Sequence, residues 1–222
     1  MADAHANPSR DPSDDGTMVG MARSILGKFL ASVDDMLPAR VISFDRTTNR
    51  ATVVPLVKVL TTDDRLIGRA QVASVPVVRM GGGGMVLTFN LRPGDLGWIK
   101  ANDRDISLIM QAYRDEGPNT LRMHSFQDAV FIPDPMTGVT IPGEDAENAT
   151  LKTLDGSVRV SIWPDRIKCT AGALSMTLGP SSIDFVGHVN IPDGATINGI
   201  EFATHRHTGV DVGSGTSGGP VA

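Results

Sequence analysis

The feature that most constrains the fold is an alternation of apolar and polar residues in the last third of the chain. Apolar residues of one parity recur in short runs, each bounded by a turn: Val158, Val160 and Ile162; Ile167 and Cys169; Leu174, Met176 and Leu178; Ile183, Phe185, Val189 and Ile191. Side chains two residues apart lie on the same side of a strand, so these runs predict strands of about five to nine residues. Each strand has one narrow apolar edge that a single chain cannot bury by itself. The segment therefore predicts a β-helical or intertwined oligomeric stem.

The competing interpretation of this segment is an ordinary β-sandwich. Aromatic residues make up only 5% of the chain, and bulky side chains are scarce in this part, which weakens that alternative. In a trimeric stem, the apolar parity should face the threefold axis. We expect this of Val160, Ile162, Leu174, Met176, Ile183 and Phe185.

The middle of the chain predicts a small closed barrel. The sequence from Ala39 to Asp45 predicts a strand, residues 46–49 a polar turn, and the sequence from Arg50 onward a second strand, which together are typical of a hairpin. Further strands are expected within residues 65–80, 85–90, 94–101 and 105–112, which gives about five or six in this region. The four glycines at 81–84 are expected to form a flexible loop. Residues 114–150 are turn-rich and are interpreted as a connecting region with a strand at 128–132.

The start of the chain has a different character. Residues 1–16 are small and polar and predict a disordered arm. Apolar residues then recur at helical spacing from Met18 to Leu37, and Pro38 should stop the helix. We expect one amphipathic helix whose apolar stripe covers a neighbouring surface. A role at a membrane surface is disfavoured, because the polar face is not strongly basic.

Two histidines near the C-terminus form the sharpest motif. His205 and His207 are two residues apart, so in a strand both imidazoles lie on one face. Two ligands make a weak metal site, but three chains meeting on an axis would supply six imidazoles, enough for an octahedral transition metal. The alternative is a pair of solvated histidines in a tail. The predicted oligomeric stem that leads into the pair favours the metal site.

Composition excludes several classes of function. The formal net charge of -5 argues against a nucleic-acid binder, and the single Cys169 excludes an intrachain disulfide or a cysteine-based zinc site. No signal peptide and no membrane span is recognisable, so we expect synthesis in a cytoplasm. The glycine run at 213–218 and the glycines at 81–84 lack the context of a phosphate-binding loop. No nucleophile elbow occurs, and the carboxylates are scattered, so the chain is not expected to be an enzyme.

Three stretches together resemble a known family, the central spike proteins of contractile phage tails, of the baseplate assembly protein V type. The first is Arg40–Asp45 with Ala51–Pro55, and the second is Gly94–Ile99 with Arg104–Ile106. The third is the histidine motif with its glycine-rich tail, residues 204–219. Relatives also occur in pyocin-like particles.

This resemblance implies an all-β fold with an N-terminal helix, an OB-fold barrel and a trimeric triple-stranded β-helix that ends in a metal-binding apex. It divides the chain at the following boundaries: 1–37, arm and amphipathic helix; 38–135, OB-fold domain; 136–155, connector; 156–200, intertwined stem; 201–222, apex. It also implies one iron ion per trimer, held octahedrally by six nitrogens of His205 and His207. Nickel or cobalt would suit the same ligand set. Residues 1–37 have no clear counterpart in the family.

The implied function is mechanical. The homotrimer would be a virion protein of the tail-tip baseplate, assembled in the host cytoplasm, that contacts hub or tail-tube proteins. It would pierce the host outer membrane when the sheath contracts. Two alternatives stay open. One is an OB-fold module that binds oligonucleotide or saccharide, which predicts exposed aromatic side chains on a basic face. The other is a metal-dependent enzyme, which needs an open coordination position that six histidines would not leave.

Overall fold

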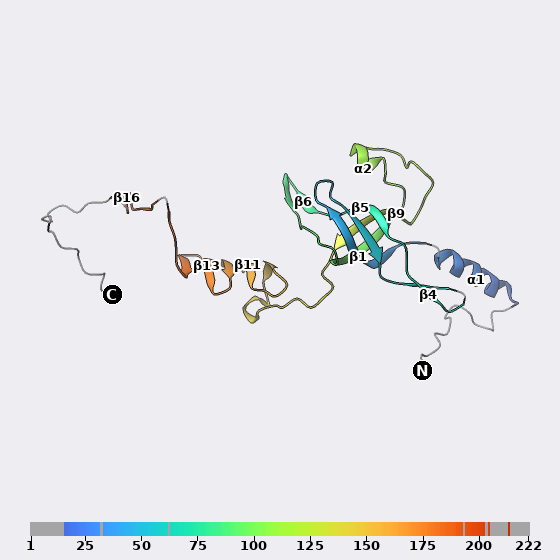
Figure 1. The fold of residues 1–222 in the computed structure, drawn as a ribbon, viewed down its shortest axis with the longest axis horizontal. Helices are drawn as coiled ribbons and strands as arrows, with labels where there is room; N and C mark the ends of the chain where they lie inside the picture. Colours follow the sequence, from blue (N-terminus) through green and yellow to red (C-terminus); the bar gives the residue numbers. More distant parts are fainter. Residues whose placement is uncertain are drawn as a thin grey trace. The chain divides into compact units, whose positions relative to one another are not determined.

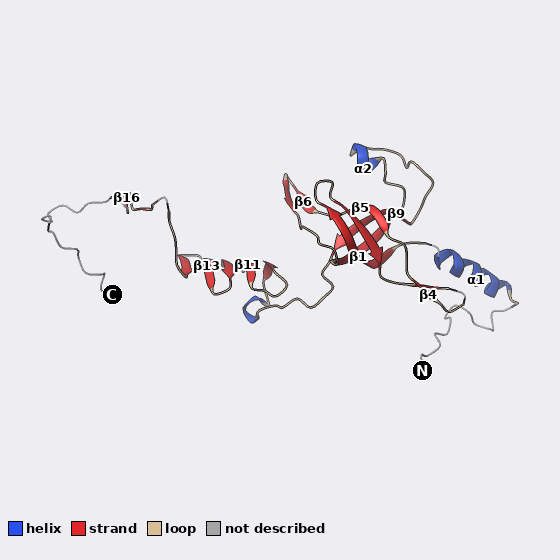
Figure 2. Ribbon diagram, in the orientation of Figure 1, coloured by secondary structure: helices blue, strands red, loops and turns tan. Residues whose placement is uncertain are grey.

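The computed structural model describes residues 16–31, 33–61, 63–192, 194–202, 204 and 213, drawn in colour in Figure 1. The chain divides into two compact units, Met1–Gly138 and Val139–Ala222. Among these described residues, almost all of the regular structure is β, apart from helix α1 near the N-terminus, the short helix α2 and one 3-10 turn (Figure 2). No helix in the described part of the chain is long and apolar enough to cross a membrane.

The first unit is built on a five-stranded antiparallel sheet in the order β5-β2-β1-β8-β9. Its strands are β1 (Met36–Asp45), β2 (Arg50–Pro55), β5 (Val72–Pro76), β8 (Leu96–Asn102) and β9 (Ser125–Pro133). The first and last strands of this order approach each other just beyond β5. There Val77 bridges Phe131 in parallel, and the Val78 N–H donates to the Phe131 carbonyl at 2.8 Å. The sheet is therefore a nearly closed barrel of five strands, which agrees with the prediction of a small barrel of about five or six strands.

The barrel has a core of mostly small apolar residues. The burial of β2 alternates along the strand, as expected when every second side chain points inward. The core residues are Ala39, Val41, Ala51, Val53, Val75, Val77, Leu91, Ile99, Ala101, Phe126, Ala129 and Phe131. Gly97 has to be a glycine, because a Cβ there would collide with the Phe131 ring and the Ile132 carbonyl. The largest core residue, Phe131, thus fits only because its neighbour on β8 has no side chain.

The predicted hairpin β1–β2 is confirmed together with its turn. The Asp45 carboxylate accepts hydrogen bonds from the Thr47 N–H at 2.8 Å and from the Thr48 hydroxyl at 2.8 Å. Asn49 takes a left-handed φ of 56°, a conformation that asparagine tolerates. Its side chain donates to the Val77 carbonyl at 2.6 Å, which ties the turn to the closing edge of the barrel.

Helix α1 and residues 105–112 differ from the sequence-based expectation. The helix α1 (Met18–Ala31) is shorter than predicted, because Leu37 already pairs with Ile99 in the sheet. The strand expected at 105–112 is wrong; this segment begins with a turn in which the Asp105 carboxylate accepts from the Ser107 N–H at 2.9 Å. The helix α2 (Ile109–Ala112) follows that turn.

The four-glycine run forms part of a hairpin rather than an open loop. It joins β6 (Met80–Gly82) to β7 (Met85–Leu87), and Gly83 and Gly84 make the turn at φ values of 58° and 83°. A second small hairpin pairs β3 (Val59–Leu60) with β4 (Leu66–Ile67).

The second unit contains a five-stranded antiparallel sheet in sequential order. The 3-10 turn η2 (Gly143–Asp145) precedes its strands β10 (Ala149–Lys152), β11 (Val158–Ile162), β12 (Ile167–Ala171), β13 (Leu174–Leu178) and β14 (Ile183–Val186). A two-residue hairpin, β15 (Thr196–Ile197) and β16 (Ile200–Glu201), follows. In the single chain, the described residues of the predicted stem thus form a meander and not a β-helix. The strand β10 lies within the segment 136–155 that was interpreted as a connector.

Candidate functional site: an uncovered apolar sheet face

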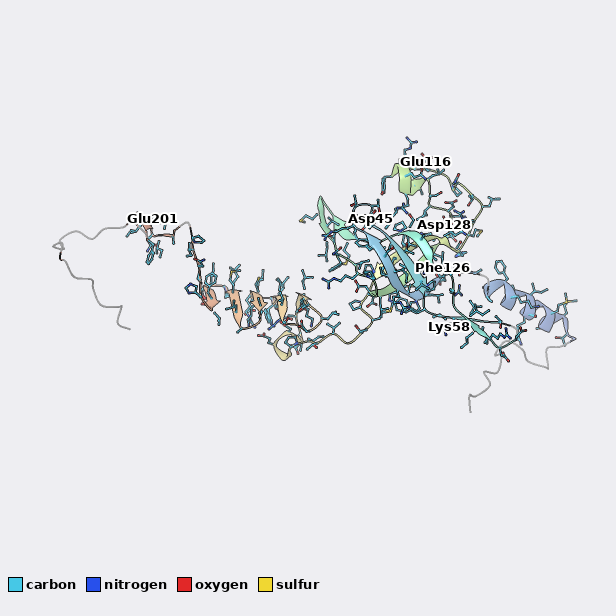
Figure 3. All side chains as sticks on the ribbon, in the orientation of Figure 1. Asp45, Lys58, Glu116, Phe126, Asp128 and Glu201 are labelled. Carbon is cyan, nitrogen blue, oxygen red and sulfur yellow. The ribbon has the colours of Figure 1, made fainter. Side chains whose placement is uncertain are left out.

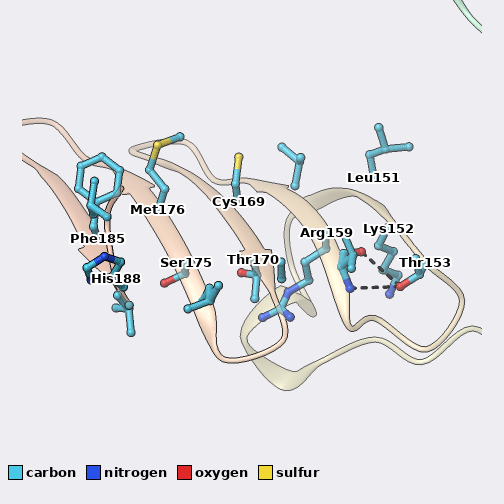
Figure 4. Close-up of a pocket in the computed structure, with 17 residues that line it drawn as sticks. Leu151, Lys152, Thr153, Arg159, Cys169, Thr170, Ser175, Met176, Phe185 and His188 are labelled. Atoms are coloured by element: carbon cyan, nitrogen blue, oxygen red, sulfur yellow. Dashed lines mark hydrogen bonds between the residues drawn. The ribbon is translucent and has the colours of Figure 1, made fainter. Parts of the chain in front are cut away.

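The register of the second sheet aligns apolar residues into rows that run across the strands. In the central row, Leu151 pairs with Val160, and the row continues through Cys169, Met176 and Phe185. A flanking row consists of Ala149, Ile162, Ile167, Leu178 and Ile183. In Figure 4, Leu151, Cys169 and Met176 stand on one side of the sheet, whereas Arg159, Thr170 and Ser175 stand on the other. Because strand side chains alternate, the pairing makes one face of this sheet apolar.

This apolar face is open to solvent in the single chain. The exposed fractions are 53% for Leu151, 54% for Leu174, 56% for Ile183 and 55% for Phe185. The face is also hollowed, with a volume of about 630 Å³ that Val158, Met176, Phe185 and Val189 help to line. A contiguous apolar surface of this kind on a water-exposed sheet is typical of a surface that another molecule covers.

The opposite face of the same sheet is polar and is closed by its own chain. Arg159 is the centre of this closure: its guanidinium pairs with Glu144 and, through Nε, with the Asp145 carboxylate at 2.7 Å. Lys168 Nζ lies 3.0 Å from the second Glu144 oxygen. The turn η2 therefore lies over β11 and β12, where it buries Ser161 and Asp145. The turn covers the polar face over β11 and β12, whereas no described residue of this unit covers the apolar face.

Both carboxylates in this closure have pKa values below the ordinary range. For Glu144 the main cause is the hydrogen bond from Lys168, and the charges of Lys168 and Arg159 act in the same direction. For Asp145, burial opposes the charged form, but the hydrogen bond from Asn148 and the ion pair with Arg159 outweigh it and lower the pKa. Both side chains are thus charged at neutral pH and hold η2 against the sheet.

A second charged cluster anchors the long loop between β8 and β9 in the barrel unit. Arg122 pairs with Asp128 at 2.9 Å and with Asp105 at 3.1 Å, and the Thr120 hydroxyl donates to Asp105 at 2.7 Å. Hydrogen bonds from Ser107, together with those from Thr120 and the charge of Arg122, hold the pKa of Asp105 far below its usual range. These contacts join Asp105 and Thr120 of the loop to Asp128 of β9 through Arg122, so the cluster is a structural anchor.

The predicted metal ligands, His205 and His207, lie outside the described residues. Within the part of the chain that the structure describes, no group of three or more histidine, cysteine, aspartate or glutamate side chains could hold a metal ion. The iron site therefore stays a prediction from the sequence.

The barrel offers little to the alternative of oligonucleotide binding. Stacking of bases needs a row of exposed aromatic side chains beside basic ones. Between β1 and β9, the exposed aromatic side chains are Phe89 and Tyr113, which lie on different loops. Trp98 is half-buried, and its indole N–H donates a hydrogen bond to the Asp134 carboxylate at 2.8 Å. This N–H is therefore already used within the barrel unit.

Sequence reasoning found the apolar face but missed what closes the polar one. The alternation of residues 158–185 was a sufficient signal for the face, because it depends only on strand periodicity. Glu144 and Asp145 lie in a turn that the sequence left irregular, and their pairing with Arg159 spans about fifteen residues of chain with no motif. The Arg122 anchor was missed for the same reason. The side chains of the described residues are drawn as sticks in Figure 3, where Phe126 and Asp128 of β9 are labelled.

The barrel is similar in sequence to a domain family of phage proteins. Residues 37–134 match the family described as Phage protein Gp138 N-terminal domain. The match begins one residue after the start of β1 and ends one residue after the end of β9, so it coincides with the barrel. No curated protein matches the sequence. Residues 37–134, which form the barrel, are thus similar to the Phage protein Gp138 N-terminal domain.

Proposed function

We propose that this chain is a structural protein of the virion, the trimeric central spike of a contractile tail baseplate. The observation that carries the proposal is the uncovered apolar face of β10–β14, attached to a barrel that matches a phage domain. In the proposed assembly, each copy contributes its sheet as one side of a three-sided stem. The apolar rows face inward, and the polar faces, closed by Arg159 and its partners, face outward.

The energetic argument rests on the area of the apolar face. Fully burying a large apolar side chain contributes about 1.5–3 kcal/mol. Nine side chains of this face are between 38% and 56% exposed: Leu151, Val158, Ile162, Ile167, Leu174, Met176, Leu178, Ile183 and Phe185. Covering them would thus contribute about 1 kcal/mol each to the stability of the assembly. Association of three copies through their apolar faces would remove this surface from water.

We propose an OB-fold for the barrel, because its strand order is the one that this fold requires. Strands β1, β2 and β5 form a meander, β8 pairs on the other side of β1, and β9 closes against the end of β5 in parallel. The barrel would act as the rigid base of the spike and would contact hub or tail-tube proteins of the baseplate. It would not bind nucleic acid.

The mechanism proposed is mechanical and needs no catalytic group. Sheath contraction would drive the stem through the host outer membrane, and a narrow rigid point would concentrate the force. At the tip, His205 and His207 of three chains would hold one iron ion and join three chain ends that otherwise fray. The support for this ion is the spacing of the two histidines and the resemblance of residues 204–219 to the spike apex.

The mass of the full-length protein in solution, measured together with its metal content, tests the proposal. We expect three chains and one iron ion per particle. The matched control is the pair His205→Ala with His207→Ala, which should lose the ion and keep the trimer, because the stem is held by apolar burial. A monomer at micromolar concentration would contradict the spike. A trimer without a transition metal would contradict the proposed metal site at the tip but would be consistent with the proposed trimeric stem.

A further inference from the structure

The hairpin of strands β6 and β7 carries large apolar side chains that are exposed to water. Met80 is 70% exposed, Met85 79% and Val86 58%. The register pairs Met80 with Leu87 and Gly82 with Met85, so the two methionines and the leucine lie on one face of the hairpin. Val86 lies on the other face. Both faces of the hairpin therefore expose apolar surface.

The tip of the hairpin has no polar side chain with which to recognise a protein partner. Residues 80–87 contain only glycine, methionine, valine and leucine. Gly81 also leaves no room for a side chain, because a Cβ there would collide with the Met85 carbonyl oxygen. Interfaces between proteins combine apolar contacts with about one hydrogen bond per 100–200 Å². An apolar tip without side-chain hydrogen-bond donors suits a medium without fixed partners, and a lipid bilayer is such a medium.

The base of the hairpin is fixed to the barrel. The Val78 N–H donates to the Phe131 carbonyl at 2.8 Å, and Val78, Leu87 and Phe89 line a small hollow beside Asn49. A two-stranded hairpin is at best marginally stable by itself in water. These contacts therefore hold the base, and the exposed residues 80–86 form a tip that the barrel presents to solvent.

Basic side chains flank the hairpin. The chain contains no aspartate or glutamate between Asp64 and Asp95, although its formal net charge is -5. Arg79 directly precedes β6, Arg92 lies shortly after β7, and both are exposed. Neither guanidinium pairs with a carboxylate in the part of the chain that the structure describes. Arginine side chains in these positions can contact lipid phosphates while the apolar tip enters the headgroup region.

We propose that the β6–β7 hairpin binds membranes by inserting its apolar tip into the headgroup region of an anionic phospholipid bilayer, with Arg79 and Arg92 at the lipid phosphates. The insertion would be shallow, because the outer edges of the two strands need hydrogen bonds from water or headgroups. For a protein that crosses a membrane, this contact would hold the barrel unit at the lipid surface. In the trimer proposed above, three hairpins would bind together and with higher avidity than one.

Flotation of the full-length protein with vesicles tests the proposal. At about 0.15 M salt, we expect binding to vesicles of equal parts phosphatidylglycerol and phosphatidylcholine. Binding to phosphatidylcholine alone should be at least about tenfold weaker. Met85→Asp should weaken binding to the mixed vesicles at least about tenfold, because it places a carboxylate among anionic headgroups. The matched control is Leu121→Asp, at a residue that is 97% exposed on the loop between β8 and β9. This control should bind as the wild type does, and both variants should keep the barrel transition.

Substitution of the arginines tests the electrostatic part of the proposal. Each arginine near an anionic surface strengthens binding about fivefold. Arg79→Gln combined with Arg92→Gln should therefore weaken binding to the mixed vesicles at least about tenfold. Arg79→Lys combined with Arg92→Lys keeps both charges and should retain most of the binding. Added salt should weaken the binding of the wild type, because it screens the same charges.

Methionine oxidation of the wild-type protein provides a measurement that needs no substitution. Hydrogen peroxide converts exposed methionines to sulfoxides, which mass spectrometry quantifies for each peptide. Met80 and Met85 should be oxidised rapidly in buffer and at least about fivefold more slowly when the mixed vesicles are bound. Met123, which is 52% exposed on the loop between β8 and β9, should be oxidised at the same rate in both conditions.

A wild-type protein that does not bind the mixed vesicles overturns the proposal and favours a protein partner for the hairpin. Slow oxidation of Met80 and Met85 in buffer alone also overturns it, because another part of the chain or another copy then covers the tip. Binding that Met85→Asp leaves unchanged and Ile25→Asp abolishes would assign the lipid contact to helix α1 instead. The mass of the particle is a separate result: a monomer contradicts the trimeric spike, whereas a trimer that does not bind vesicles contradicts only the hairpin proposal.

Discussion

The barrel and the C-terminal sheet contain the same number of strands, yet they differ in where their apolar residues go. In the barrel, the sheet curves until its first and last strands meet, so Phe131, Ile99 and Val53 are completely buried. In the second sheet the strands stay in a meander, and the apolar row through Met176 and Phe185 remains exposed. A sheet that closes on itself needs no partner, whereas a sheet with one apolar face needs another layer. We therefore expect the two units to have different roles, the barrel as a self-contained domain and the second sheet as the proposed assembly surface.

A charge in the middle of the apolar face should have the largest effect. We expect Phe185→Asp to keep the chain from associating, because three carboxylates would be buried together at a cost of several kcal/mol each. Sedimentation should show a monomer, while the barrel keeps its own thermal transition. The control is Thr177→Asp, which places the same charge on the polar face of the neighbouring strand. If Phe185→Asp remains a trimer, the face does not lie at the interface.

A cavity in the barrel core should affect only the barrel. Phe131→Ala removes the largest completely buried side chain and should cost about 4 kcal/mol. Calorimetry should show the barrel transition shifted to lower temperature and the particle mass unchanged. Phe89→Ala, at a residue that is 50% exposed, should change the barrel transition much less. Loss of the trimer in Phe131→Ala would mean that the two units are not independent.

Acid should weaken both units through their carboxylates. The pKa values of Asp105, Glu144 and Asp145 are lowered in the folded protein. The stability that they contribute is therefore fully present above their ordinary values near 4 and is lost as the pH falls below them. We expect the barrel transition temperature to fall between pH 4 and the lowest accessible pH, and Asp105→Asn to flatten that dependence. A slope that Asp105→Asn leaves unchanged would contradict the role of the Arg122 anchor.

Removal of the second unit should have the smallest effect on the barrel. The fragment 33–138 retains every strand of the barrel and the Asp34 contacts to Arg69 and Phe126. We expect it to unfold cooperatively within a few degrees of the barrel transition of the full chain. A fragment without a cooperative transition and without dispersed amide resonances would show that the barrel depends on the stem.

Strand periodicity predicted much of the fold, because it depends only on neighbouring residues. It located the hairpin β1–β2 and its turn, the strand around Trp98 and the apolar parity of the last third. It failed where a long-range contact decides the local structure. Leu37 continues a helical pattern but pairs with Ile99, and Asp105 starts a turn because Thr120 and Arg122 lie close to it in space.

The sequence was sufficient to predict the apolar face of the candidate site, but not the contacts that close the opposite face. The alternation from Val158 to Phe185 indicated an apolar face that needs a partner. No local pattern indicated that Glu144 and Asp145 would close the opposite face through Arg159, because that contact joins a turn to a strand that follows it. His205 and His207 remain a sequence-based prediction, since they lie outside the described residues.

Other copies of the chain are proposed to cover the apolar face. The reactivity of the Cys169 thiol measures directly whether this face is covered. Cys169 is the only cysteine, it lies in the central apolar row between Val160 and Met176, and it is only partly buried within its own chain. In the native full-length protein we expect its thiol to react with a maleimide at least about tenfold more slowly than in denaturant. In a Cys169→Ala background, Asp184→Cys on the exposed polar face should react rapidly. If Cys169 in the native protein reacts as fast as in the unfolded chain, no other copy covers the apolar face.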